Sequence, residues 1–484
     1  MAASIHLGID EVYYAQFANH LSYNYFDHPP MVAWLIRLTT VNLWLSNDVT
    51  IRLGAILCSA AATWVIYCCG CIISNSKTGC IAAMLYNACL YTSVISGTFI
   101  LPDAPQVLCW LGALYYLLHI TNNKSITNKK KRFVLYLGLC VGIGMLCKVH
   151  TIFLWFAFGL YCLVHHTQWL KQAQLYIAVG ITLVCILPLL YWNIVHDFVT
   201  FNYHGGRVNV TEGGINFTSF VQFNAGQFFY QNPIVYIVII YALVALYNKK
   251  IEIRKGQQFI LLYAALPLII VSEIIALKKQ VLPHWTGPAY ISLILIAAIY
   301  LAKVTVISKL PKITYIACTL SITIVISGVL IINYMPKTLG SSKVDNMGAN
   351  DFTLDMYGWA SASKALNIII NKYPTQDAVI LTNSWLSAAP IAHYLAEPNH
   401  IPILAIGSID AVHQYYWWNK KVQKRNKQKT VLLIKLSNFN YDENTLTPLL
   451  GNTPTYVDTI KQYRSGAWVR YITVHHYNNV VLHY

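Results

Sequence analysis

The chain has 484 residues, of which 56% are apolar and 11% are charged, and its mean hydropathy is +0.48. Soluble globular chains carry about 25% charged residues, so this composition indicates a membrane protein. The net charge of +16 does not indicate a nucleic-acid partner, because the lysines lie in short loops between apolar runs and no nucleic-acid-binding motif occurs.

Residues 1–50 are unusually polar for so apolar a chain. Within GIDEVYYAQFANHLSYNYFDHPPMVAW (8–34) lie Asp10, Glu11 and Asp27, three of only 18 acids. Asp10 and Glu11 either occupy the first turn of a helix, where acids favour the helix dipole, or serve a functional site. The Pro-Pro pair after Asp27 and His28 either starts the next helix or belongs to that site.

Ten apolar runs are predicted to be transmembrane helices, because a bilayer core needs about 17–25 apolar residues per helix. They cover residues 51–73, 78–99, 103–121, 133–149, 151–165, 175–195, 233–248, 257–276, 286–303 and 312–334. All 12 cysteines lie in apolar segments and lack the spacing of a metal site, so we expect buried, inert thiols.

Basic loops predict the orientation of these helices. Lysines and arginines cluster at 124–132, 249–255 and 303–312. When the helices are numbered in order, all three loops fall on one side, which the positive-inside rule makes cytoplasmic. The other loops and everything after about residue 335 then face outward.

The same count places the N-terminus outside, although residues 1–9 are too short for a helix or a signal peptide. Either the first helix inserts without a leader, or an upstream transmembrane helix is missing from this sequence. We expect the second.

The composition changes near Met335 and predicts a separate C-terminal domain. AVILT (378–382) and TVLLIKL (430–436) have the pattern of buried strands, and SWLSAAPIAHYLA (384–396) that of a helix between them. We therefore expect a membrane domain at 1–334, with 1–50 as its first outer loop, and an α/β domain at 335–484. The basic run at 420–429 is either a solvated loop or a surface for anionic lipid headgroups.

The remaining scarce polar residues gather on the predicted outer side. They are Asp103 in LPDAP, Lys148, His150, Arg207, Lys278, Lys279 and His284, with Arg37 and Arg52 at the ends of the first loop's helix. Each has a structural alternative: Lys148 can extend to the membrane interface, and His284 with Trp285 can belong to an interfacial belt. Together they favour one site at the membrane surface, because ionisable groups at membrane depth are costly.

Such a site suits phosphate chemistry. A carboxylate can take the proton of an acceptor hydroxyl, while lysine, arginine and histidine can hold a phosphate and stabilise the charge that develops on it. Without a nucleotide motif, a lipid-carried phosphate is the expected donor, and a lipid-phosphate-dependent glycosyltransferase is the expected class. A transporter is the rival, but the two halves show no repeat and the polar residues lie in loops.

Several motifs carry a resemblance to a known family. DEVYYAQFANHLSYNYFDHPPMVAWLIRL, RLGAIL (52–57), LPDAPQVLCW, GMLCKVHT, YWNIVHDF, QNPI, LPHWTGPAY, MYGWASASKAL and SAAPIAHYL follow one another in order along the chain. They resemble the bacterial glycosyltransferases of the dolichyl-phosphate-mannose protein mannosyltransferase superfamily, including the aminoarabinose and galacturonate transferases that modify lipid A.

The resemblance implies the GT-C fold, an α-helical polytopic membrane protein with a C-terminal α/β extracytoplasmic domain. It also implies a polyprenyl-phosphate sugar donor and, in most relatives, inversion at the anomeric carbon. By motif, Asp10 matches the catalytic acid of the first loop and Glu11 is its neighbour. Asp27 and His28 stand where relatives carry Glu-Lys, near the lipid phosphate and a possible divalent metal ion.

Lys148 and Arg207 match basic positions for the donor phosphate, and Asp103 and His284 match residues that shape the cavity. Relatives also begin with a transmembrane helix before the Asp-Glu pair.

The sequence hypothesis is therefore an inner-membrane glycosyltransferase with its active site facing the periplasm. It would move one sugar from a polyprenyl phosphate to an envelope acceptor, lipopolysaccharide or lipid A. The alternatives are a protein acceptor, as in protein O-mannosyltransferases, or a polytopic transporter. Whether Asp10 acts as a base or orients an ionised acceptor phosphate stays open.

Overall fold

The computed structural model describes residues 1–211, 214–306, 309–370, 372, 378–423, 429–450 and 453–480. The chain forms two compact units. The terminal unit combines Met1–His20 with Ile326–Tyr484, and the helical unit is Leu21–Val325. This division differs from the expected boundary at 334/335, because the first twenty residues fold with the C-terminal part rather than with the bundle.

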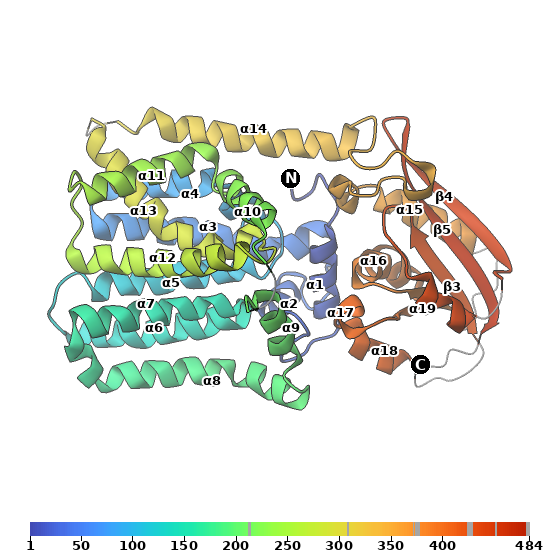
Figure 1. Cartoon of the computed structure of the whole chain (residues 1–484), viewed down its shortest axis with the longest axis horizontal. Helices are drawn as coiled ribbons and strands as arrows, with labels where there is room; N and C mark the ends of the chain where they lie inside the picture. Colours follow the sequence, from blue (N-terminus) through green and yellow to red (C-terminus); the bar gives the residue numbers. More distant parts are fainter. Residues whose placement is uncertain are drawn as a thin grey trace. The chain divides into compact units, whose positions relative to one another are not determined.

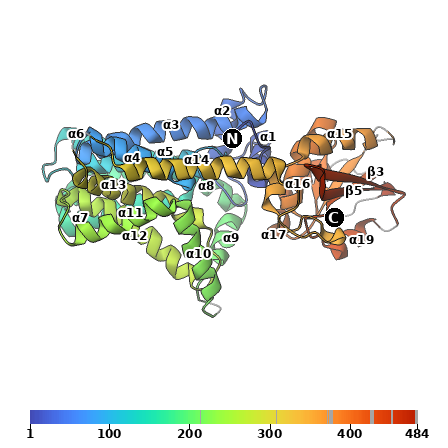
Figure 2. The same ribbon diagram turned by 90° about the horizontal axis from the view of Figure 1, so that it is seen from above.

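The helical unit is a bundle in which long helices run side by side (Figures 1 and 2). After α2 (Met31–Thr39), it contains α3 (Asp48–Ile73), α4 (Ser76–Ala88), α5 (Asp103–Ile120), α6 (Asn128–Cys147), α7 (Phe153–His165), α8 (Ala173–Val195), α9 (Val199–Val208), α10 (Phe217–Tyr230), α11 (Pro233–Tyr247), α12 (Lys255–Ala276), α13 (Gly287–Val304) and the first part of α14 (Lys312–Tyr334). Short π- or 3-10 turns intervene, among them η1 (Tyr91–Ile95), η2 (Val149–Ile152) and η4 (Pro283–Thr286).

Each of the ten predicted spans overlaps a helix, but the span predicted at 78–99 is helical as α4 only to Ala88 and continues in the π-turn η1. Over the described residues, five helices are long and apolar enough to cross a membrane, and the pair α10–α11 makes a sixth if it is one span. That pair bends by 97°, and Figure 2 shows α10 leaving the direction of α11. The chain is thus a multi-pass membrane protein, and a count of ten spans stays a prediction.

Helix α13 occupies the middle of the bundle. Almost all of its side chains are buried, and it packs on α4, α11 and α12. The bundle core continues through Trp110 and Leu111 of α5. A helix that is apolar on all sides has to be surrounded by other helices, which accounts for its central place.

The basic loops meet at one end of the bundle. The guanidinium of Arg254, before α12, donates to the side-chain oxygen of Asn122, after α5, at 2.6 Å. The ammonium of Lys303, near the end of α13, donates to the carbonyl of Lys250 at 2.5 Å. The three loops that the sequence assigns to one side therefore lie together.

All 12 cysteines are free thiols. Cys58, Cys69, Cys89, Cys147 and Cys162 are buried, as expected, but Cys80 is exposed. The apolar sequence pattern does not distinguish this exposed position of α4 from a buried one.

The α/β architecture expected for the C-terminal part is present in the terminal unit. The sheet has the order β2-β1-β3-β5-β4, with β1 (Val379–Thr382), β2 (Ile403–Ala405), β3 (Lys429–Leu436), β4 (Tyr456–Arg464) and β5 (Ala467–Val480). Strand β1 is parallel to β2 and β3, whereas β5 is antiparallel to β3 and β4. Helices α15 (Trp359–Ile370), α16 (Trp385–Ile391), α17 (Ile409–Val412), α18 (Tyr415–Gln423) and α19 (Glu443–Leu450) complete it.

Both predicted strands and the helix between them are therefore confirmed, the helix as α16 followed by the π-turn η7 (Ala392–Ala396). Of the basic run at 420–429, residues 424–428 lie outside the described residues.

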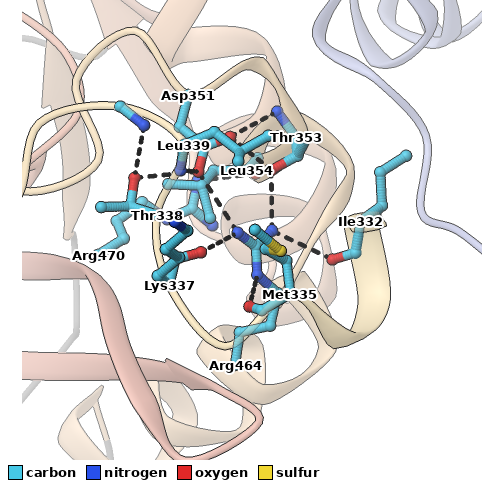
Figure 3. Close-up of polar contacts among 11 residues, drawn as sticks. Ile332, Met335, Lys337, Thr338, Leu339, Asp351, Thr353, Leu354, Arg464 and Arg470 are labelled. Atoms are coloured by element: carbon cyan, nitrogen blue, oxygen red, sulfur yellow. Dashed lines mark hydrogen bonds and ion pairs between the residues drawn. The ribbon is translucent and has the colours of Figure 1, made fainter. Parts of the chain in front are cut away.

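The hairpin β4–β5 holds the C-terminal end of α14 (Figure 3). The buried guanidinium of Arg464 donates to the carbonyls of Ile332, Met335 and Lys337 at 2.6–3.2 Å. It also donates to the hydroxyl of Thr353 at 2.8 Å and lies 3.5 Å from the carboxylate of Asp351. The last carbonyls of a helix have no partner within the helix, and a cation at that end is favourable.

Candidate functional site

An ion pair lies where α5 begins and α6 ends. The ammonium of Lys148 is 2.9 Å from Oδ2 of Asp103 and 3.1 Å from Oδ1, and both side chains are over nine-tenths buried. Asp103 is the first residue of α5. Lys148 follows the last residue of α6 in an extended conformation, which turns its side chain out of the helical path.

Tyr91 is the third member of this group. Its hydroxyl donates to Oδ1 of Asp103 at 3.1 Å. The ring lies over Gly287, where a Cβ would come within 2.2 Å of it. Only glycine at the start of α13 leaves room for the tyrosine, so Gly287 is part of how the group is built.

The segment with Asp27 and His28 is held by one face of α9. The amide of Asn24 donates to the hydroxyl of Thr200 at 3.0 Å, and the rings of Phe26 and Tyr203 pack at 4.7 Å. On the same helix, Nε2–H of His204 donates to the carbonyl of Asp27 at 2.8 Å.

Because positions 200, 203, 204 and 207 follow one another at helical spacing, the residues of this face lie together. His28 in turn lies with Nδ1 3.0 Å from Oδ2 of Asp27.

Arg207 extends this face of α9. Its guanidinium lies over the ring of Trp285 at 5.0 Å and over that of Tyr203 at 5.6 Å. Trp285 belongs to the turn before α13, and its ring is also 6.1 Å from that of His150. A cation over a tryptophan face is favourable by about 0.5–2 kcal/mol.

The two groups form one electrostatic cluster within the helical unit. His284 interacts with the charges of Lys148, Asp103, His28 and Arg207. His150 interacts with Lys148 and Asp103 and also with His204. Five separate segments thus converge: 24–28, the start of α5, the end of α6, α9 and the turn before α13. We call the set of charged and imidazole side chains on these segments the imidazole–lysine cluster. Its members are Asp27, His28, Asp103, Lys148, His150, His204, Arg207 and His284.

Burial keeps one histidine of this cluster neutral. The pKa of His204 is lowered to about 4, first by burial and then by the nearby His28, against the opposing effect of its bond to Asp27. At neutral pH this imidazole is therefore a hydrogen-bond donor that fixes the segment 24–28, not a cation.

Asp27 and His28, the predicted metal ligands, lie beside each other as a pair. Over the residues that the structure describes, no group of three or more His, Cys, Asp or Glu side chains is arranged to hold a metal ion. Asp27 and His28 are instead hydrogen-bonded to each other, as a paired acid and imidazole.

Asp10 and Glu11 lie in the terminal unit, in the first turn of α1 (Ile9–Asn19). The carboxylate of Glu11 accepts the backbone N–H of Gly8 at 2.9 Å, and its side chain is only 2% exposed. This is a capping-box contact, which starts the helix. Asp10, next to it, is exposed.

The structure brings six of the eight predicted residues together in the helical unit: Asp27, His28, Asp103, Lys148, Arg207 and His284. Sequence reasoning missed His204, Tyr91 and Trp285 as partners. The signal for His204 was present, since TFNYHGGR (200–207) places Thr200, Tyr203, His204 and Arg207 on one helix face, but residues 196–232 were read as a loop. Tyr91 gave no local signal.

Comparisons with known proteins agree with this geometry. Residues 27–192 match the sequence model of the dolichyl-phosphate-mannose-protein mannosyltransferase family. The lipid A galacturonosyltransferase RgtD of Rhizobium johnstonii is 25% identical over 286 residues, which are 59% of this chain and 58% of the relative. The match thus spans under two thirds of that relative's length.

Crystal structures of ArnT from Cupriavidus metallidurans show the same fold. The apo form aligns with a TM-score of 0.60 and the form bound to undecaprenyl phosphate with 0.61, both at 14% identity. The alignments cover 98% of this chain and 94–95% of the ArnT chain.

The fold is therefore the GT-C fold that the sequence resemblance implies. Residues 27–192 are similar to the dolichyl-phosphate-mannose-protein mannosyltransferase family, and the chain shares the fold of ArnT.

Proposed function

We propose that the protein is a membrane glycosyltransferase. It moves one monosaccharide from a polyprenyl-phosphate sugar to lipid A or lipopolysaccharide. The observation that carries this proposal is the imidazole–lysine cluster, in which a buried ammonium, a guanidinium and four histidines meet at one end of an apolar bundle. The names of the relatives, a lipid A galacturonosyltransferase and an ArnT bound to undecaprenyl phosphate, support the same substrate classes.

In this proposal the cluster binds the donor phosphate. Lys148 uses two of its N–H groups on Asp103, so a further donor remains for a phosphate oxygen. Arg207 supplies a second cation, and His28 and His284 supply imidazole N–H groups. These groups stabilise the phosphate dianion that forms as the sugar–phosphate bond breaks.

Asp10 acts on the acceptor. If the acceptor is a hydroxyl, its oxygen attacks the anomeric carbon while Asp10 takes the proton, and the polyprenyl phosphate leaves from the opposite face, which inverts the centre. If the acceptor is a phosphate group of lipid A, it is already ionised, and Asp10 orients it. Glu11 supports Asp10 by capping the helix that carries it.

The same proposal includes an inner-membrane location with the active site facing the periplasm. It is supported by the meeting of the three basic loops at one end of the bundle, since the positive-inside rule makes that end cytoplasmic.

The deciding experiment is mass spectrometry of lipid A, core oligosaccharide and envelope proteins from cells with and without the gene. A gene-dependent sugar on lipid A or core is the expected result, and a gene-dependent sugar only on proteins would favour the protein-acceptor alternative. Purified protein in liposomes with lipid A and undecaprenyl-phosphate-linked galacturonate or aminoarabinose then tests direct transfer. Solute accumulation by those liposomes without any polyprenyl-phosphate sugar would favour a transporter instead.

A further inference from the structure

The terminal unit carries a stack of three buried or half-buried side chains that ends on the segment before Asp10. The guanidinium of Arg470, on β5, lies 4.6 Å from the ring centre of Trp359. The Trp359 ring stacks on Tyr394 of η7 at 5.2 Å, with only 7° between the planes. The edge of His6 then meets the Tyr394 ring at 5.6 Å.

Tyr394 clamps the backbone of one residue. Its phenolic oxygen accepts the N–H of Leu7 at 2.8 Å, and its O–H donates to the carbonyl of Leu7 at 3.3 Å. Gly8, which follows, is the N-cap of α1 and is bound by Glu11. The clamp therefore lies directly before the first helical turn, which carries Asp10.

A second contact holds the same segment. The N–H of His6 donates to the carbonyl of Met356 at 3.2 Å. On either side of Met356, the carbonyls of Leu354 and Tyr357 accept from the guanidinium of Arg470 at 3.0 Å each. Arg470, labelled in Figure 3 beside Leu354, thus fixes both the turn under His6 and the stack under Leu7.

Burying the guanidinium of Arg470 removes a charge from water and costs free energy. Arg470 is fully buried, and a buried guanidinium is tolerated only when its donors are satisfied. Here they are, by two carbonyls and by the side-chain oxygen of Gln462 at 2.6 Å. The result is a rigid platform under a short N-terminal segment that has no regular structure of its own before Ile9.

We propose that Tyr394 and Arg470 are positioning residues for Asp10, so that the C-terminal part of the terminal unit holds the helix that carries this acid. Tyr394 fixes the start of α1, and Arg470 fixes Tyr394 through Trp359. This inference rests on the proposed function for the role of Asp10, but the clamp itself does not depend on it.

Tyr394→Phe tests the proposal, because it keeps the ring stack and removes the hydroxyl that makes the two bonds to Leu7. The matched control is Tyr441→Phe, since the hydroxyl of Tyr441 also accepts a backbone N–H, that of Leu436 at 2.9 Å, in the same unit. Transfer from an undecaprenyl-phosphate sugar gives kcat and the donor KM, and hydrogen exchange of the peptide covering residues 5–12 reports the clamp.

We expect Tyr394→Phe to lower kcat about tenfold, since small misplacements of a reacting group cost this much or more, with the donor KM within about twofold of the wild type. Exchange in the 5–12 peptide should be faster in Tyr394→Phe and unchanged in Tyr441→Phe.

An unchanged kcat in Tyr394→Phe, or an equal loss in both variants, overturns the positioning role. If the wild type transfers no sugar, the proposed function fails. The exchange experiment then still decides whether Tyr394 holds the segment, and unchanged exchange overturns the clamp.

Discussion

The ammonium of Lys148 and the carboxylate of Asp103 form a two-pronged ion pair, with both oxygens of the acid within 3.1 Å of Nζ. Removing one partner of a buried pair leaves an unpaired charge and typically costs 3–5 kcal/mol. A loss of stability is therefore expected whether the pair is structural or binds phosphate. Donor binding has to be measured together with stability to distinguish the two roles.

Lys148→Met and Asp103→Asn separate the two roles. Both variants should unfold at a lower temperature, because each leaves a buried partner uncompensated. Only Lys148→Met should raise the KM for the lipid donor, by about tenfold or more, since Asp103→Asn keeps the cation. If the donor KM is the same in Lys148→Met as in the wild type, Lys148 does not bind the phosphate.

His204 should act through the position of the segment 24–28. His204→Ala loses the bond to the carbonyl of Asp27 and should weaken donor binding, whereas His204→Gln keeps an N–H donor and should retain most of it. Donor KM values for the two variants check this. Equal losses in both would mean that the imidazole itself touches the donor.

The lowered pKa of His204 also predicts a pH dependence of stability. An unfolded histidine titrates near 6.5 and the folded one at about 4, so the folded state binds fewer protons between these values. Stability contributed by this group is therefore complete above about pH 6.5 and is lost as the pH falls toward 4, by roughly 1–3 kcal/mol. Thermal unfolding from pH 4 to 7 should show a smaller acid loss in His204→Gln than in the wild type.

Asp10 should lower the stability of its own unit. The pKa of Asp355 is raised to about 7, first by burial and further by the charges of Asp10 and Asp351, against the effect of Arg470. Because the pKa of Asp355 is higher in the folded state than in the unfolded state, the folded state binds the proton more tightly. The stability contributed by this group therefore falls as the pH rises from about 4 to about 7.

Asp10→Asn should remove part of this fall, raising the unfolding temperature at pH 8 but not at pH 4, while nearly abolishing transfer. Unfolding curves at the two pH values check the predicted change in stability, and a transfer assay checks the predicted loss of activity. The catalytic assignment would be wrong if transfer persisted in the folded variant.

Gly287→Ala should disturb the cluster by pushing Tyr91 away from Asp103, because the new Cβ would lie 2.2 Å from the ring. We expect a lower unfolding temperature and reduced transfer. Gly328→Ala is the matched control, since a Cβ at Gly328 meets nothing within 4 Å and alanine favours a helix. Identical behaviour of the two variants would show that Tyr91 adapts.

The apolar runs predicted the long helices of the bundle, because long hydrophobic segments are a local property of the sequence. Helices α2, α9 and α10 were not predicted, because their residues fall in the expected outer loops 1–50 and 196–232. The cluster residues Lys148 and Arg207 were found because charges are scarce in such a chain. Tyr91 was missed because its role depends on Gly287, far away in the chain. Strands β4 and β5 were missed because they bury polar and charged side chains such as Arg464 and Arg470, which hide the apolar pattern of a strand. The packing of α1 on α16 was missed because residues 1–20 contain no local signal for it.

The terminal unit is discontinuous, with Met1–His20 and Ile326–Tyr484 separated by the entire bundle. During synthesis the first twenty residues leave the ribosome long before the strands and helices that hold them exist. The platform for Leu7 needs β5, which follows the entire bundle in the sequence. Asp10 thus reaches its native surroundings only after the whole bundle has been made, and a chain that ends before β5 would lack the contacts that hold the start of α1.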